Sequence, residues 1–257
     1  MEAISVVIIT YNEERNIRRC LDSVRDISDD IVVVDSFSTD RTEEICREYG
    51  VRFFQRAFDG YIEQKNYADS LTANDWILSV DADECLSEKL CDSIRATQKN
   101  FRCDAYIMNR MTCYCGKWIR HGDWYPDRKL RLWKKTKGKW GGFKIHEKVE
   151  LDADACTGYL KGDLLHYSYY TVSDHVSQAN RFTDVMAESR YMKGKKAGFS
   201  RILLRPFWKF IKSFVIRLGF LDGHYGFVIS IISSHATFLT YVKLRQLRKM
   251  NSISRVH

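Results

Sequence analysis

Residues 75–84 have the sequence DWILSVDADE, and this stretch decides the fold that we predict. An apolar run from Trp76 to Val80 ends abruptly at Asp81-Ala82-Asp83. The run is too short for a helix and predicts a buried strand. Ligands of open α/β sheets bind beyond the carboxyl ends of the strands, and carboxylates two residues apart on extended backbone project to the same side. The pattern favours a site for a divalent cation that also contacts phosphate, whereas an isolated Asp-x-Asp is more often an acidic turn.

The first 55 residues predict that this strand belongs to a parallel sheet. Three apolar runs, at residues 4–9, 31–34 and 51–54, are separated by helical patterns over 17–24 and 42–49. Asp40 is placed to cap the second of these helices. The alternation predicts an α/β fold with a doubly wound, mostly parallel sheet. Because the strands all end in polar residues, those residues are expected to meet at one edge, which is where we place the site.

The chain resembles the family 2 glycosyltransferases of GT-A fold over roughly residues 4–170. The resemblance is carried by SVVIITYNEERNI (5–17), VVVDSFSTDRT (32–42) and VDADE (80–84). Two later segments, YPDRKLRLW (125–133) and IHEKV (145–149), resemble the bacterial subgroup that adds glucose or another hexose to lipopolysaccharide core. The usual VDDGSTD motif stands here as VDSFSTD (34–40), without the second Asp or the Gly.

The resemblance implies an inverting, metal-dependent enzyme that moves a hexose, with glucose expected, from a UDP-sugar to a lipid-linked saccharide such as lipopolysaccharide core. A divalent cation, Mg²⁺ or Mn²⁺, would neutralise the pyrophosphate leaving group. Asp83 is expected to contact the metal directly, with Asp81 on the ribose or in the outer shell and His166 completing the shell. The residues expected to bind the donor are Thr10, Tyr11, Glu13, Asp35, Lys65, Asp81, Arg128 and Arg131.

The acceptor hydroxyl requires a general base, which is typically a carboxylate within hydrogen-bond reach. Glu147 is the first candidate, because the base of the resembled family lies at about this stage of the chain. Asp127 is the second candidate. The alternative for Glu147 is an ordinary surface residue paired with Lys144 or Lys148.

Charge is concentrated in the last quarter of the chain. Residues 193–257 hold thirteen Lys or Arg and one acid, Asp222, whereas the other 192 residues hold 28 bases and 32 acids. Apolar residues recur there at helical spacing, and basic residues recur on the opposite side: Leu203, Phe207, Phe210, Phe214 and Leu218 against Arg201, Arg205, Lys209 and Lys212. Such a basic amphipathic helix indicates attachment to an anionic membrane surface. The alternative is a helix packed on the domain with its basic side in water.

These observations predict a catalytic domain over residues 1–170 and a basic, helical, membrane-associating region over 171–257. The apolar stretch Tyr225–Val242 contains Ser, His and Thr, and its purely apolar part is shorter than the ~20 residues of a spanning helix. The chain is therefore expected to be cytoplasmic and peripheral on the cytoplasmic face of the inner membrane. With no secretory leader recognised, its eight cysteines are expected to be reduced, and their spacing fits no common zinc motif.

Other classes of protein fit the sequence less well. No aromatic-basic strand pattern or zinc finger indicates nucleic acid binding. A haloacid-dehalogenase-type phosphatase would place its Asp-x-Asp near the N-terminus, and a nucleotidylyltransferase would begin with a Gly-rich loop where residues 10–15 contain no glycine. A membrane-surface nucleotide-binding protein without transferase activity is the non-enzymatic alternative.

Overall fold

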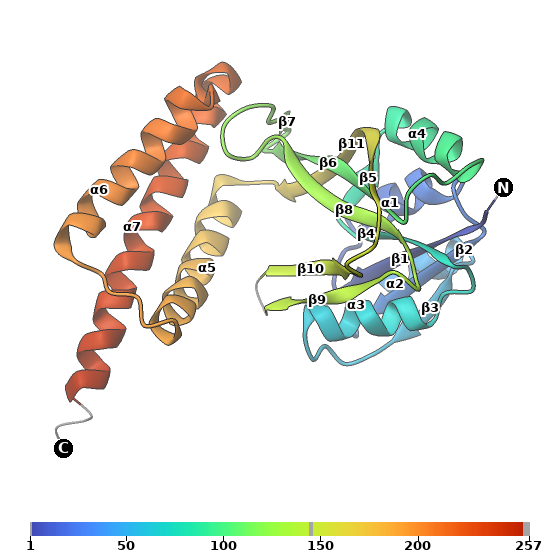
Figure 1. Ribbon diagram of the computed structural model, residues 1–257, viewed down its shortest axis with the longest axis horizontal. Helices are drawn as coiled ribbons and strands as arrows, with labels where there is room; N and C mark the ends of the chain where they lie inside the picture. The colour runs from blue at the N-terminus through green and yellow to red at the C-terminus, as the bar shows by residue number, and fades with distance from the viewer. Residues whose placement is uncertain (1, 144–145, 254–257) are drawn as a thin grey trace. The chain divides into compact units, whose positions relative to one another are not determined.

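The computed structural model describes residues 2–143 and 146–253, and the chain divides into two compact units (Figure 1). The first unit contains the residues up to Met111 together with Asp127–Tyr167. The second contains Thr112–Pro126 and the chain from Ser168 onward. The division into a catalytic domain over 1–170 and a membrane-associating region over 171–257 stays a prediction.

The structure has eleven strands: β1 (Ile4–Thr10), β2 (Asp30–Asp35), β3 (Arg52–Gln55), β4 (Trp76–Asp81), β5 (Glu84–Leu86), β6 (Ala105–Tyr114), β7 (Lys117–Trp118), β8 (Asp127–Lys134), β9 (Gly138–Phe143), β10 (His146–Leu151) and β11 (Thr157–Tyr169) within the described residues. The α-helices are α1 (Ile17–Val24), α2 (Thr42–Glu48), α3 (Tyr61–Ser70), α4 (Glu88–Gln98), α5 (Val172–Met192), α6 (Phe199–Phe210) and α7 (Gly223–Ile253). Two short turns join the last two helices, the π-helical η1 (Ile211–Ile216) and the 3₁₀-helical η2 (Gly219–Asp222).

The main sheet has the strand order β3-β2-β1-β4-β8-β6-β11-β5, with β7 paired to β6. Strands β3, β2, β1 and β4 are parallel, which confirms the predicted parallel sheet of an α/β fold. The pairs β4–β8, β8–β6 and β11–β5 are antiparallel. A separate two-stranded sheet is formed by β9 and β10.

The parallel strands β1, β2 and β4 are buried on both faces over most of their length, which explains their continuous apolar sequences. Successive side chains of a strand point to opposite faces, so Ile4, Val6 and Ile8 pack with α1, α2 and α4, whereas Val7 packs on the side of α3. The N-cap of α2 is Arg41, which makes no side-chain cap hydrogen bond, so the prediction that Asp40 caps this helix is wrong by one residue; the Asp40 carboxylate instead accepts the Thr42 backbone N–H at 3.0 Å. Local sequence pattern therefore determines this half of the sheet.

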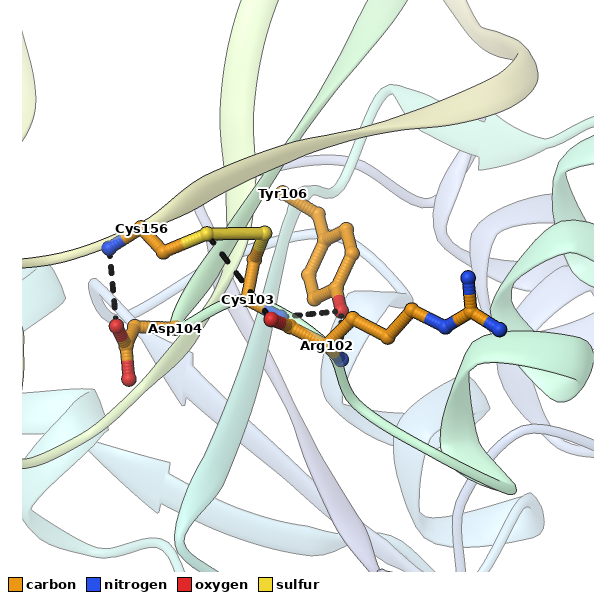
Figure 2. Close-up of a disulfide and its surroundings, with 5 residues drawn as sticks. All are labelled: Arg102, Cys103, Asp104, Tyr106 and Cys156. Atoms are coloured by element: carbon orange, nitrogen blue, oxygen red, sulfur yellow. Dashed lines mark hydrogen bonds between the residues drawn. A yellow bond between two sulfur atoms is a disulfide. The ribbon is translucent and has the colours of Figure 1, made fainter.

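A disulfide joins Cys103 to Cys156 across 53 residues of sequence (Figure 2). The Cys156 N–H donates to the Asp104 carboxylate at 2.9 Å, and the Tyr106 hydroxyl accepts the N–H of Cys103 at 3.1 Å. The expectation that all the cysteines are reduced is therefore wrong for this pair, because the pairing of β6 with the segment before β11 brings the two residues together. The other six cysteines are free thiols.

The second unit is built around α7, which packs against both α5 and α6. Helix α5 begins at a capping box, in which the Thr171 hydroxyl accepts the Asp174 N–H and the Asp174 carboxylate accepts the Thr171 N–H. The segment Gly219–Met250 contains an 18-residue window with a mean hydropathy of 1.4, and it is long and apolar enough to cross a membrane by length and composition alone. Buried core helices of soluble proteins pass the same test, so this property alone decides nothing.

Candidate active site

The carboxyl ends of the central strands bring three predicted site residues into register. Thr10 at the end of β1 lies opposite Asp35 of β2, and the preceding Ile9 lies opposite Asp81 of β4. Thr10 is buried, and its hydroxyl oxygen has no hydrogen-bond partner among the described residues. A buried hydroxyl without a partner is a position where a bound ligand or water can supply the missing hydrogen bond.

Asp81 is held by two buried cations. One of its carboxylate oxygens lies 2.9 Å from the Lys65 ammonium, and the other accepts a hydrogen bond from the Arg131 guanidinium at 2.6 Å. Burial by itself raises the pKa of Asp81, but the charges of Arg131 and Lys65 outweigh it and hold the pKa well below its usual range. Asp81 is thus an ionised carboxylate with both oxygens already engaged by protein, which suits a supporting position better than direct metal contact.

Glu84 extends this cluster toward β6 and β8. Its side chain is fully buried and accepts from Arg131 and from Arg110, each at 3.2 Å, as well as from the Asp81 backbone N–H at 3.0 Å. Arg110 in turn contacts Asp127, its direct cross-strand partner, at 2.8 Å. A chain of alternating charges therefore runs from Lys65 to Asp127, and each buried charge has an opposite partner as burial requires.

A β-bulge accounts for the position of Arg131. Tyr106 pairs with Leu132, but the next residue, Ile107, pairs with Leu130, so Arg131 is the extra residue on β8. Bulges re-aim side chains and are common beside active sites. The indole of Trp140 covers the cations on one side, with its ring centroid 4.3 Å from the Lys65 ammonium.

Asp83 is arranged differently from Asp81, although only one residue separates them. Its carboxylate lies 3.1 Å from the Nε2 atom of His166, and its backbone carbonyl accepts the Tyr167 N–H at 2.9 Å. The pairing of β11 with β5 places His166 opposite Glu84, next to Asp83. The other ring nitrogen of His166 is buried and has no hydrogen-bond partner within the described parts of the chain.

Glu13, from the loop after β1, lies in the same electrostatic environment. Burial raises the pKa of Glu13, the hydrogen bond from Asn16 opposes that rise, and the negative charge of Asp83 adds to it. The ends of β1 and β4 are therefore close enough for their carboxylates to repel each other. Repulsion of this kind is relieved by a bound cation.

The residues at this edge fit a divalent cation that is shared with a phosphate ligand. No group of three or more His, Cys, Asp or Glu side chains forms a metal site among the residues that the structure describes. Asp83 and His166 nevertheless offer an oxygen and a nitrogen 3.1 Å apart, and two cis ligands of Mg²⁺ with bonds of about 2.1 Å are separated by about 3 Å. Magnesium usually takes one or two protein ligands and completes its shell with water and phosphate.

The remaining predicted residues lie around this centre in varied settings. Asp35 is fully buried and accepts hydrogen bonds from the backbone N–H and the hydroxyl of Ser38, so it fixes the loop after β2. Tyr11 is 57% exposed, as stacking on a base requires, and Arg128 is exposed on β8. Glu147 lies on β10 opposite Gly142 and is half-buried.

The two candidate bases differ in how they are held. Both oxygens of Asp127 are engaged, one by Arg110 and the other by Lys129 at 3.2 Å. Glu147 has no ion-pair partner among the described residues, whereas its neighbour Lys148 lies 3.9 Å from Glu150. Lys144, the other residue considered as a partner of Glu147, lies outside the described residues.

Sequence reasoning missed Glu84 and Arg110. Glu84 directly follows the Asp-x-Asp motif, so the signal was present in VDADE. Arg110 is one of many polar residues in an antiparallel strand, and nothing in its local sequence indicates that it contacts Glu84.

The chain belongs to Glycosyl transferase family 2, whose profile matches residues 5–164. It is 35% identical to an uncharacterized glycosyltransferase of Rickettsia typhi, over 96% of this chain and 88% of that protein. It is 26% identical to LpsC of Rhizobium meliloti, a lipopolysaccharide core biosynthesis glycosyltransferase, over 95% of this chain and 92% of that protein. The structure of S. aureus TarS 1-349 in complex with UDP aligns at 14% identity with a TM-score of 0.48, over 97% of this chain and 92% of that chain.

The protein is therefore a glycosyltransferase, and the predicted family is confirmed. This result sets aside the phosphatase and the nucleotidylyltransferase that the acidic motif also allowed.

Proposed function

We propose that the protein transfers a hexose, glucose in the first instance, from a UDP-sugar to a lipid-linked saccharide of the lipopolysaccharide core type, with inversion and with a divalent cation. The observation that carries the proposal is the Asp83–His166 pair, which interacts electrostatically with the half-buried Glu13 in the loop after β1. The partnerless hydroxyl of Thr10, at the end of β1, supports it. The name of the LpsC relative supports the choice of acceptor.

Asp83 and His166 are the residues that would hold the cation, Mg²⁺ or Mn²⁺. When bound, the cation neutralises the charge that develops on the leaving diphosphate. Thr10, Tyr11 and Glu13 follow β1 and are placed to bind the uridine. Asp35 supports them indirectly, because the Ser38 that it holds accepts the backbone N–H of Asn12 at 2.8 Å. Each of these residues is either at the sheet edge or in a loop fixed to it.

Lys65, Arg131 and Asp81 act as a unit in this proposal. The two cations hold Asp81 at 2.9 Å and 2.6 Å, so they set the position of the strand end that leads into Asp83. They contribute positive potential toward the diphosphate, while Arg128, exposed on the same strand as Arg131, is available for contact with the donor. Positioning of this kind is what preorganised electrostatic catalysis requires.

Glu147 is the proposed general base, which accepts the proton of the acceptor hydroxyl as that oxygen attacks the anomeric carbon. The C–O bond to the diphosphate breaks on the opposite face, so a β-linked product forms from an α-linked donor. Glu147 is preferred to Asp127 because neither Arg110 nor another described cation occupies its carboxylate. The reaction is proposed to take place at the anionic surface of the inner membrane, on its cytoplasmic face. The C-terminal helices would attach the protein to that surface.

Calorimetry of UDP, GDP and CDP, each with and without Mn²⁺, tests the donor site. We expect metal-dependent binding of UDP alone, lost in Asp83→Ala. The absence of any nucleotide binding by well-folded protein would refute the proposal and favour a membrane-surface protein without transferase activity.

Transfer of labelled glucose from UDP-glucose to a lipid-linked saccharide tests the base. Glu147→Gln should lower kcat by about 10²–10⁴ and leave UDP binding intact. Glu150→Gln is the matched control, because this residue lies on the same strand and is already paired with Lys148. Equal loss of activity in both variants would exclude a specific role for Glu147.

A further inference from the structure

The segment from α6 through η2, residues 199–222, carries a large uncovered apolar surface. We call this surface the α6 apolar face, and its exposed members are Phe199, Leu203, Leu204, Phe207, Trp208, Val215, Ile216, Leu218, Phe220 and Leu221. Isolated exposed apolar residues are normal, but contiguous patches mark interaction sites. A surface made of ten large side chains on consecutive turns belongs to the second kind.

Helix α6 has three sides with different chemistry. Phe199, Leu203 and Phe207 follow one another at intervals of four residues, as do Leu204 and Trp208. A second side carries basic residues, and a third side, with Ile202 and Pro206, is buried. Leu203 and Phe207 are 53% and 65% exposed, so the helices of their own unit leave them uncovered.

The buried side of α6 is fixed to α7. The Ser230 hydroxyl donates to the Ser213 hydroxyl at 3.2 Å, and the Ser234 hydroxyl donates to the Pro206 carbonyl at 2.7 Å. Further along α7, Tyr241 and Leu244 pack with Ile202. From Ser230 to Leu244 along α7, the contacted residues run backward in sequence from Ser213 to Ile202. The two helices therefore lie antiparallel and side by side, as Figure 1 shows.

This arrangement constrains how the unit can meet a membrane. Charged residues occur on successive turns of α6 and η1, at Arg201, Arg205 and Lys209 and then at Lys212, and a charge near the bilayer centre is costly. A helix with a charged side along its whole length is stable in the plane of the interface instead. Because α7 lies along α6, it shares that orientation, although its length and composition alone would allow it to span.

The basic residues beside the α6 apolar face favour an anionic lipid surface, rather than a second copy of the protein, as the partner of that face. Lys209 and Arg217 are both paired with Asp123. Arg201, Arg205 and Lys212 have no carboxylate partner among the residues described. A symmetric dimer through this surface would bring these like charges together, whereas lipid phosphates would neutralise them.

We propose that the α6 apolar face is an in-plane anchor, which inserts into the acyl boundary of an anionic bilayer while Arg201, Arg205 and Lys212 contact lipid phosphates. The inference rests on the membrane partner in the proposed function and is independent of the transfer reaction. The proposed function places membrane attachment in the C-terminal helices generally, whereas this inference places it in the α6 apolar face. Helix α7 then supports α6 from the protein interior and does not span the membrane.

Sedimentation of the full chain with vesicles tests the surface. Arg201→Gln, Arg205→Gln and Lys212→Gln together should weaken binding to phosphatidylcholine–phosphatidylglycerol vesicles about 100-fold, since each basic residue contributes about fivefold. The same triple variant should bind pure phosphatidylcholine as the unaltered protein does. Leu203→Glu with Phe207→Glu should lose binding to both vesicle types. Lys89→Gln, Lys99→Gln and Lys161→Gln together, three exposed residues of the other unit, are the charge-matched control and should retain binding.

Unchanged vesicle binding by the Leu203→Glu, Phe207→Glu variant would overturn the proposal. The proposal would also be overturned if the unaltered protein formed a dimer that this double variant abolishes and did not bind vesicles. Calorimetric measurement of UDP binding by each variant distinguishes failure of the proposed membrane anchor from failure of the proposed transferase function. Loss of vesicle binding with UDP binding intact supports the anchor in a folded enzyme, while vesicle binding without any transfer would contradict only the proposed reaction.

Quenching of Trp208 by brominated lipids tests the orientation, with Trp208→Phe supplying the background from the other tryptophans. An in-plane helix predicts stronger quenching by bromine near the headgroup end of the acyl chain than by bromine near the bilayer centre. Quenching that is strongest at the centre would contradict in-plane insertion and indicate a spanning hairpin.

Discussion

Asp81→Asn should lower stability and retain UDP binding, whereas Asp83→Asn should leave stability nearly unchanged and abolish UDP binding. The two residues nevertheless belong to one motif. Asp81 is the counter-ion of Lys65 and Arg131, whose side chains are 3% and 5% exposed. Removing one partner of a buried ion pair costs about 3–5 kcal/mol, because the remaining charge is left unpaired. Arg131 keeps Glu84, and the Lys65 ammonium keeps the Trp140 ring at 4.3 Å, so we expect the lower end, about 3 kcal/mol.

That loss corresponds to a fall in Tm of roughly 6–12 °C for a protein of this size. Asp83 is 27% exposed and contacts one histidine, so its replacement should change stability by less than about 1 kcal/mol. Asp83→Asn should instead abolish metal-dependent UDP binding, which Asp81→Asn retains below its Tm. Thermal unfolding followed by circular dichroism, together with calorimetry, measures both effects.

The pH dependence gives a second test of Asp81. Its pKa in the folded protein is well below the unfolded value of about 3.9, so its contribution to stability is present above that value and lost as pH falls further. The difference in Tm between the unaltered protein and Asp81→Asn should be constant above about pH 5 and shrink below pH 4. The double variant Asp81→Asn, Lys65→Met should be more stable than Asp81→Asn alone. Equal thermal stability of the Asp81→Asn and Asp83→Asn proteins would refute the reasoning.

Three further predictions concern His175, Asp69 and Asp127. Burial lowers the pKa of His175 to about 4, so between pH 6.5 and 4 only the unfolded chain gains its proton, and up to about 3 kcal/mol of stability should be lost. Urea unfolding of His175→Phe should lack this part of the pH slope. Burial raises the pKa of Asp69 to about 7, so Asp69→Asn should be more stable than the unaltered protein at pH 8, with an advantage that disappears toward pH 4. Asp127→Asn should lower the Tm, because Arg110 loses a partner at 2.8 Å, and should leave kcat within about threefold; a kcat loss as large as that of Glu147→Gln would make Asp127 the base.

The N-terminal half of the fold follows from local sequence. The β-branched runs, the amphipathic helix after β1 and the hydrogen bond from the Thr42 N–H to Asp40 each depend on residues a few positions apart. Hydrophobic periodicity and short-range hydrogen bonds depend on spacing within one segment, so the sequence pattern can reveal them. The same local pattern placed Thr10, Asp35 and Asp81 at one edge, because parallel strands must end together. It also identified the apolar and basic sides of α6.

Tertiary structure decided which charges meet and which surfaces are covered. Lys65, Asp81, Glu84, Arg110 and Arg131 come from five different elements, and their contacts depend on the β4–β8–β6 pairing and on one bulge. A one-residue shift of register moves a side chain to the other face of a sheet, and no local pattern encodes that shift.

The same limit holds at α6, where the sequence defined an apolar side but not whether protein would cover it. Pro206 of α6 and Ser213 of the following η1 contact α7, so this segment packs through its narrow third side. Periodicity determines the faces of a helix, because it depends on spacing along one chain segment. The partner of each face is determined by segments distant in sequence, and here that left the apolar face exposed.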